Sequence, residues 1–181
     1  MDLPSTAGHL PQPLHVGERT YLVDRATRDD VAAVVALLRD DALGTARESG
    51  LDDDLGPYLE AFDEIDTDPR QLLVVVRRHD GAVVATLQLT FLRTLSRRGG
   101  LRLQVEAVRV AGSERGAGLG AAVMAWATDV GRARGAVVAQ LTTDRRRVDA
   151  HRFYERLGWV DTHKGMKLDL GRAPGTVPDV S

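Results

Sequence analysis

Three glycines at alternate positions, Gly116, Gly118 and Gly120, follow Arg115 where a predicted strand gives way to a predicted helix. Glycine lets a backbone approach a ligand closely, and the free amides at the start of a helix bind anions. The spacing therefore predicts a phosphate or pyrophosphate site at residues 115–120. A tight turn that needs glycine for its conformation alone is the alternative.

Two other phosphate-binding loops do not fit this spacing. A Walker loop ends in Gly-Lys followed by Ser or Thr, and that ending is missing here. A dinucleotide fingerprint reads G-x-G-x-x-G with an acidic residue about 20 positions further on. This chain has G-x-G-x-G, and the first acidic residue after the next predicted strand is Asp144. Both alternatives are therefore excluded.

The strand before the glycines changes its hydrophobic phase. Apolar residues occupy the odd positions from 101 to 107, and polar residues, including Glu106, occupy the even positions between them. The next apolar residues, Val108 and Val110, are at even positions. Side chains alternate strictly along a strand, so this shift predicts a bulge near Ala107. A bulge leaves backbone groups that need another partner.

The remaining pattern predicts the elements that position this loop. The capping-box pair Thr27 and Asp30 marks a helix start. The ends of the chain, residues 1–18 and 171–181, are predicted to be flexible segments around one domain at 19–170. Strands are predicted at 20–26, 72–77, 83–91, 101–110, 136–141 and 166–170, with helices at 27–39, 56–66, 119–133 and 149–156.

Composition excludes several classes of function. The 181 residues are 43% hydrophobic and 28% charged, with a net charge of −2, as in an ordinary globular domain. Cysteine is absent, which rules out disulfides, thiolate metal sites and a cysteine nucleophile. No uninterrupted apolar run approaches the roughly 20 residues that span a bilayer, and the start of the chain does not resemble a secretory signal, so the prediction is a cytoplasmic protein without a membrane partner. Aromatic residues make up only 4%, which argues against nucleic acid as a partner.

Three motifs in order resemble the GNAT superfamily of N-acetyltransferases. Residues 115–120, Arg-Gly-Ala-Gly-Leu-Gly, resemble its acetyl-CoA-binding loop. Residues 108–110 resemble the strand end that pairs with the pantetheine arm, and residues 150–159 resemble its Phe-Tyr signature. The resemblance covers about residues 21–170. It implies an α/β fold with a mixed, mostly antiparallel central sheet, a bulged fourth strand and flanking helices.

The resemblance also implies acetyl-CoA as co-substrate. Many members have asparagine seven residues before the signature tyrosine, where this chain has Arg147. The residues implied for acetyl-CoA binding are Val108, Val110, Arg115, Gly116, Ala117, Gly118, Leu119, Gly120 and Ala121.

Acetyl transfer to an amine requires a base for the ammonium, a donor to the oxyanion and an acid for the leaving thiolate. The resemblance implies Glu106 as the base and Tyr154 as the acid, and the bulge offers the Val108 amide to the oxyanion. The alternatives are a solvated Glu106 paired with Arg102 or Arg109, and a Tyr154 that only packs.

The predicted acceptor is the primary amine of a small molecule, but its charge stays open. Residues 40–68 hold eleven acidic residues and one base, which favours a cationic amine. Residues 145–154, with His163 and Lys167, are instead similar to aminoalkylphosphonate N-acetyltransferases. That similarity implies an anionic amine held by arginines such as Arg97, Arg98 and Arg102.

Other functions and partners also stay open. The chain could be a non-catalytic acetyl-CoA-binding regulatory module, or could acetylate a protein amine. The five histidines lack metal-ligand spacing, so no metal is predicted. A homodimer is a further option.

Overall fold

The computed structural model describes residues 9–40, 54–168 and 170. Asp41, Asp52 and Asp53 of the acidic segment, residues 1–8 of the N-terminal segment and the C-terminal tail at 171–181 lie outside the described residues. The chain divides into two compact units, residues 1–141 and 142–181. The single domain predicted over residues 19–170 includes residues of both units and stays a prediction.

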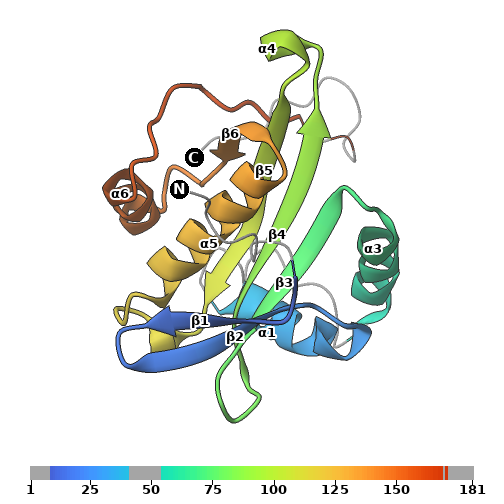
Figure 1. Cartoon of the computed structure of the whole chain (residues 1–181). Helices are drawn as coiled ribbons and strands as arrows, with labels where there is room; N and C mark the ends of the chain where they lie inside the picture. Colours follow the sequence, from blue (N-terminus) through green and yellow to red (C-terminus); the bar gives the residue numbers. More distant parts are fainter. Residues whose placement is uncertain (1–8, 41–53, 169, 171–181) are drawn as a thin grey trace. The chain divides into compact units, whose positions relative to one another are not determined.

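The first unit is built on one six-stranded sheet whose strands follow the order of the chain (Figure 1). The first five strands pair antiparallel, and β5 and β6 pair parallel. This confirms the predicted mixed, mostly antiparallel sheet. The strands are β1 (Gln12–Val16), β2 (Arg19–Arg25), β3 (Gln71–Arg77), β4 (Val83–Arg93), β5 (Leu101–Val110) and β6 (Ala136–Leu141).

Strand β1 is a correction to the sequence analysis, which expects a flexible segment through residue 18. Residues 12–16 pair with β2 to form a hairpin. The segment is short and contains Pro13, so its local sequence carries little strand signal. Because β1 precedes the other strands, the bulged strand is the fifth strand of the sheet rather than the predicted fourth.

Helices cover both faces of the sheet. The 3-10 turn η1 (Arg28–Asp30), α1 (Val31–Arg39) and α3 (Gly56–Thr67) pack against one face around a core that includes Phe62 and Val75. Helix α5 (Leu119–Ala133) packs against β5 and β6. It approaches β5 so closely that a Cβ on Gly131 would lie 2.8 Å from Leu103 Cδ2. Two short elements complete the unit, α4 (Ser96–Gly99) between β4 and β5 and the 3-10 turn η2 (Gly112–Glu114) after β5.

The second unit contains α6 (Val148–Arg156). The strand predicted over residues 166–170 is not formed in the described residues, and Met166 is 91% exposed. Leu168 and Leu170 are exposed as well. Apolar alternation shows which face of a strand would be buried, but a strand also needs a partner that this segment does not have.

The predicted helix start at Thr27 is anchored by a buried carboxylate. Asp30 is 6% exposed, and it accepts hydrogen bonds from the Thr27 amide (2.8 Å) and from Arg77 Nη2 (2.7 and 2.8 Å). Burial raises the pKa of Asp30, but the bonds from Thr27 and Arg77 outweigh it and hold that pKa below the ordinary aspartate range. Asp30 therefore ties η1 to β3.

We expect Asp30→Asn to lower the free energy of unfolding by about 3 kcal/mol at neutral pH, because it leaves Arg77 without its partner. The folded-state pKa of Asp30 is depressed, so its contribution is complete above the unfolded-state pKa and is lost as the pH falls through the folded-state pKa. Denaturant titrations of both proteins should therefore converge in acid. The control Asp129→Asn breaks an exposed pair with Arg132 and should cost at most about 0.5 kcal/mol. If Asp30→Asn lowered the free energy of unfolding as little as Asp129→Asn does, Asp30 would not anchor the helix start.

Within the described residues, no helix combines the length and hydropathy required to cross a bilayer.

Candidate active site

The bulge lies in β5, where the sequence places it. Gln88 faces Glu106 and Thr86 faces Arg109, so two residues of β5, Ala107 and Val108, stand opposite one residue of β4. Ala107 adopts a φ of +52°, a left-handed conformation that costs a non-glycine residue roughly 1–2 kcal/mol. This confirms the predicted bulge. The bulge turns the remaining part of β5 away from its regular course.

The sheet opens beside the bulge. Strand β6 pairs with β5 only as far as Leu141, which lies opposite Val105. Residues 106–110 of β5 therefore continue without a β6 partner among the described residues. Unpaired backbone along a strand can pair with an extended ligand as an added strand would. Residues 106–110 are thus the part of the sheet suited to such a ligand.

Two arginines contact the carbonyls of the residues predicted to meet the pantetheine arm. Arg109 Nη1 donates to the Val108 carbonyl (2.9 Å), and Arg115 Nε donates to the Val110 carbonyl (3.2 Å). A carbonyl oxygen has two lone pairs, so each can still accept a second hydrogen bond. A ligand arm here must share these carbonyls with the arginines or displace them.

The glycine loop joins η2 to α5, with Gly118 as the residue before the helix. Gly116 has a φ of +80° and Gly118 a φ of +88°, a region that side-chain-bearing residues rarely adopt. A Cβ on Gly116 would meet nothing within 4 Å, so the loop is open there. The first amides of α5 have no helical partner, and together with this open glycine backbone they are suited to bind an anion.

Arg115 points to α1 as well as to β5. Its Nη2 atom donates to the Asp40 carboxylate (2.8 Å) and to the Asp40 carbonyl (3.1 Å), at the end of α1. One guanidinium thus connects the glycine loop, the end of β5 and the end of α1. The negative charge of Asp40, one of the acidic residues expected to attract a cationic amine, is already paired with Arg115.

Glu106 is exposed on the face of the sheet that α1 and α3 cover elsewhere. It lies opposite Gln88, which in turn lies opposite Leu73 of the α1–α3 side. Cross-strand neighbours share a face. Gln88 Nε2 donates to Gln71 Oε1 (2.8 Å), so the side chain opposite Glu106 on β4 is a neutral amide. Arg109, which lies opposite Thr86, is on the same face as Glu106.

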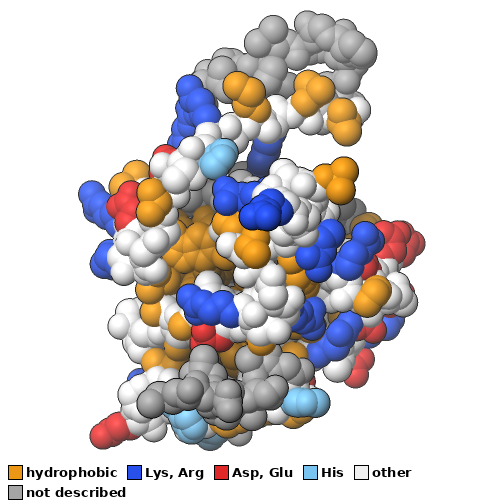
Figure 2. Space-filling model, turned by 45° about the horizontal axis from the view of Figure 1, so that its top comes forward, with side chains coloured by type: hydrophobic (Ala, Val, Ile, Leu, Met, Phe, Trp, Pro, Cys, Tyr) orange, Lys and Arg blue, Asp and Glu red, His pale blue; other side chains and the backbone are white. Residues whose placement is uncertain are grey.

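The arginines that follow β4 do not gather around Glu106. Arg97 and Arg98 lie on α4, with positive φ values, at the β4–β5 connection. Arg102, the next arginine along β5, is four residues from Glu106, or about 13 Å at the usual rise of a strand. Figure 2 shows Lys and Arg side chains spread among apolar ones over the displayed face.

Tyr154 lies on α6 of the second unit and is half-buried. Its ring makes edge contacts with Phe153 (centroids 5.1 Å apart) and Trp159 (6.2 Å). The same unit holds His151, whose Nε2 lies 2.9 Å from the Asp144 carbonyl. The packing expected as the alternative role of Tyr154 is therefore present, and it also fixes the direction of the phenol.

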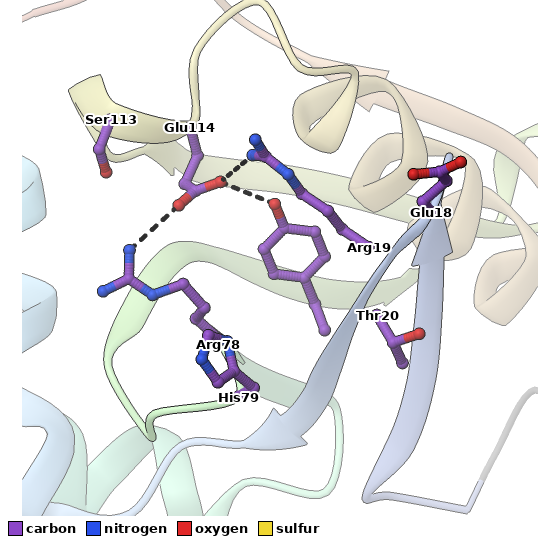
Figure 3. Close-up of a pocket in the computed structure, with 8 residues that line it drawn as sticks. Glu18, Arg19, Thr20, Arg78, His79, Ser113 and Glu114 are labelled. Atoms are coloured by element: carbon purple, nitrogen blue, oxygen red, sulfur yellow. Dashed lines mark hydrogen bonds and ion pairs between the residues drawn. The ribbon is translucent and has the colours of Figure 1, made fainter.

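A cavity of about 660 Å³ lies beside the start of the glycine loop (Figure 3). Glu114 reaches into it between Arg19 and Arg78 and is only 4% exposed. Sequence reasoning missed this residue, because an acid next to Arg115 in a polar turn carries no sign of burial. In the part of the chain that the structure describes, no three His, Asp or Glu side chains form a metal-binding group.

The comparisons with known proteins agree with this geometry. The acetyltransferase (GNAT) family model matches residues 31–159. A crystal structure described as a transcriptional regulator from Bacillus halodurans C-125 is 37% identical, with a TM-score of 0.76 over 83% of this chain and 99% of that one. Glucosamine-6-phosphate N-acetyltransferase from Arabidopsis thaliana, 19% identical, has the same fold, with a TM-score of 0.67 over 83% of this chain and 98% of that one.

A curated relative matches a shorter stretch. Aminoalkylphosphonate N-acetyltransferase of Salmonella typhimurium is 43% identical over 49 residues, which are 27% of this chain and 32% of that protein. The match therefore spans about a third of the relative's length.

Proposed function

Because this chain belongs to the acetyltransferase (GNAT) family, we propose that it is an acetyl-CoA-dependent N-acetyltransferase acting on the primary amine of a small molecule. Family membership confirms the resemblance predicted from the sequence, and an acetyltransferase family agrees with the predicted enzyme class. The observation that carries the proposal is the bulge at Ala107, after which β5 runs without a β6 partner toward the glycine loop that we expect to bind an anion.

The proposed reaction is a direct attack of the amine on the thioester. Glu106 removes a proton from the ammonium, the amine nitrogen bonds to the acetyl carbon, and the carbon–sulfur bond breaks. The Val108 amide donates to the oxyanion on the way, and Tyr154 gives its proton to the leaving thiolate. The second proton, which the amine nitrogen loses as the amide forms, restores the Tyr154 hydroxyl, and the proton on Glu106 leaves to solvent. Glycine-loop amides hold the pyrophosphate of acetyl-CoA and so orient the thioester.

The surroundings of Glu106 favour an acceptor that carries uncharged hydroxyl groups besides the ammonium that reacts. Asp40 is engaged by Arg115, and Arg97 and Arg98 lie at the other end of β5. Opposite Glu106 on β4 is Gln88, which is hydrogen-bonded to Gln71. Arg109 lies on the same face, and its Nη1 atom donates to the Val108 carbonyl. Amides donate and accept hydrogen bonds without a charge preference, which suits hydroxyl groups.

A second candidate function is a non-catalytic acetyl-CoA-binding regulatory module. It is favoured by the 37% identical structure from Bacillus halodurans, which is described as a transcriptional regulator. Such a module would need the glycine loop and the open strand, but neither Glu106 nor Tyr154. Acetylation of a protein amine is a narrower variant of the enzyme.

An acceptor screen separates these functions. The purified protein is incubated with acetyl-CoA and with neutral hydroxylated, cationic and phosphonate-bearing amines, and released CoA is measured. The proposal predicts amine-dependent release, fastest with the neutral class. Stabilisation by acetyl-CoA without release from any amine or peptide would identify the regulatory module instead.

Tyr154→Phe tests the proposed acid. The variant keeps the ring contacts with Phe153 and Trp159 and removes only the hydroxyl, so turnover should fall about 10²-fold while acetyl-CoA affinity stays the same. Phe153→Leu is the matched control, because it removes a ring contact and keeps the hydroxyl. If Phe153→Leu slows turnover more than Tyr154→Phe does, Tyr154 is a packing residue.

A further inference from the structure

The β1–β2 hairpin lies before residues 31–159, the part of the chain that the family model matches. Its turn nevertheless reaches the glycine loop. A Cβ on Gly118 would lie 3.4 Å from Val16 Cγ1, at the end of β1. Arg19 and Tyr21 of β2 both contact Glu114, the last residue of η2 and the residue before Arg115. The hairpin thus supports the loop from two directions.

Glu114 is held by three donors. Its Oε2 atom accepts from the Tyr21 hydroxyl (2.7 Å) and from Arg19 Nη1 (3.2 Å), and its Oε1 atom accepts from Arg78 Nη1 (3.4 Å) (Figure 3). A buried carboxylate is costly unless its charge is paired and its oxygens are hydrogen-bonded. The donors therefore fix this side chain, and the Tyr21 bond is the shortest of the three.

The backbone transmits this constraint to the loop. The Glu114 amide donates to the Ala111 carbonyl (2.9 Å), and the Arg115 amide donates to the Gly112 carbonyl (3.3 Å). Fixing Glu114 consequently fixes the η2 turn and the point at which residues 115–120 begin. Two and four residues after Glu114, Gly116 and Gly118 need left-handed backbone conformations that a loosened turn would sample only part of the time.

We propose that Tyr21 and Glu114 are positioning residues for acetyl-CoA binding, and that the β1–β2 hairpin preorganises the glycine loop through them. The inference rests on the proposed function, in which the loop holds the pyrophosphate. Neither side chain is required to touch the co-substrate. A loop that is already ordered binds more tightly, because binding then pays less conformational entropy.

Tyr21→Phe is the test, because it removes one hydroxyl and keeps the buried ring. Calorimetry with acetyl-CoA should show a Kd raised about tenfold, in the range of a lost hydrogen bond to a charged group. The kcat at saturating acetyl-CoA should stay unchanged, while KM for acetyl-CoA rises in parallel with Kd. Thr20→Val is the matched control, since Thr20 lines the same cavity but its hydroxyl contacts His15.

The double variant Tyr21→Phe with Glu114→Gln provides a second measurement. If Tyr21 acts on acetyl-CoA binding only through its hydrogen bond to Glu114, the double variant should bind acetyl-CoA no more weakly than Glu114→Gln alone. Arg19→Gln, which removes an exposed donor, gives a milder variant that should raise Kd in the same direction.

Two results would overturn the inference. One is a Tyr21→Phe protein with a lower Tm and an unchanged Kd, which would make the bond merely structural. The other is strictly additive losses in the double variant. Failure of the proposed function would look different, because the unmodified protein would then bind no acetyl-CoA, or would bind it without transferring an acetyl group to any amine. In the second case the Kd comparison still tests the inference.

Discussion

Replacing Gly118 by valine is expected to abolish acetyl-CoA binding while the protein stays folded. Gly118 has a φ of +88° directly before α5, and its bare backbone is where the proposed pyrophosphate site lies. A β-branched side chain would drive the residue out of the left-handed region and would cover the amides. The Cβ itself would make an ordinary contact with Val16, at 3.4 Å, so the expected loss comes mainly from the backbone conformation and from the covered amides.

Gly135→Val is the matched control for this variant. Gly135 has a φ of +77° at the opposite end of α5, and a Cβ there would meet nothing within 4 Å. Both variants therefore carry a similar backbone strain of roughly 1–2 kcal/mol, but only one carries it in the loop. Calorimetry should show binding for Gly135→Val and none for Gly118→Val, with similar Tm values. Equal affinities would show that the glycines only shape a turn.

Glu106→Gln is expected to lower kcat/KM for the best amine by about 10²- to 10⁴-fold, the range for general base catalysis. If Glu106 removes the ammonium proton, kcat/KM of the unmodified enzyme rises with pH along one ionisation limb, and the variant should lack that limb. Glutamine keeps the shape of the side chain and can still hydrogen-bond, so the comparison separates basicity from geometry.

Glu60→Gln on α3 is the control, because it removes an exposed carboxylate from another element and should leave the pH profile intact. A Glu106→Gln protein that is slower by the same factor at every pH would mean that Glu106 positions the acceptor. Deprotonation would then belong to another group or to solvent.

Local sequence patterns account for much of the fold and of the glycine loop. The phase shift in residues 101–110 is enough to predict the bulge, since it reports which face each side chain occupies. The pair Thr27 and Asp30 predicts the start of the first helix, and the glycine spacing predicts the loop. Each of these signals lies within a few neighbouring residues.

The features that sequence reasoning missed depend on contacts between distant parts of the chain. Glu114 is buried by Tyr21, 93 positions away, and Asp40 is engaged by Arg115, 75 positions away. The residues that flank Glu114 and Asp40 in the sequence do not indicate these distant partners. The strand predicted at residues 166–170 failed for the related reason that alternation gives a face but not a partner. The count of acidic residues in 40–68 likewise could not show that the charge of Asp40 is paired with Arg115.

The central claim is that this protein transfers the acetyl group of acetyl-CoA to an amine, and following a labelled acetyl group tests that claim most directly. Acetyl-CoA labelled in its acetyl group is incubated with the protein and the preferred amine of the screen, and mass spectrometry locates the label. The account predicts label on the amine nitrogen, with stoichiometric CoA and strong suppression in Glu106→Gln. Label that stays on CoA, in a protein that binds acetyl-CoA, would contradict it.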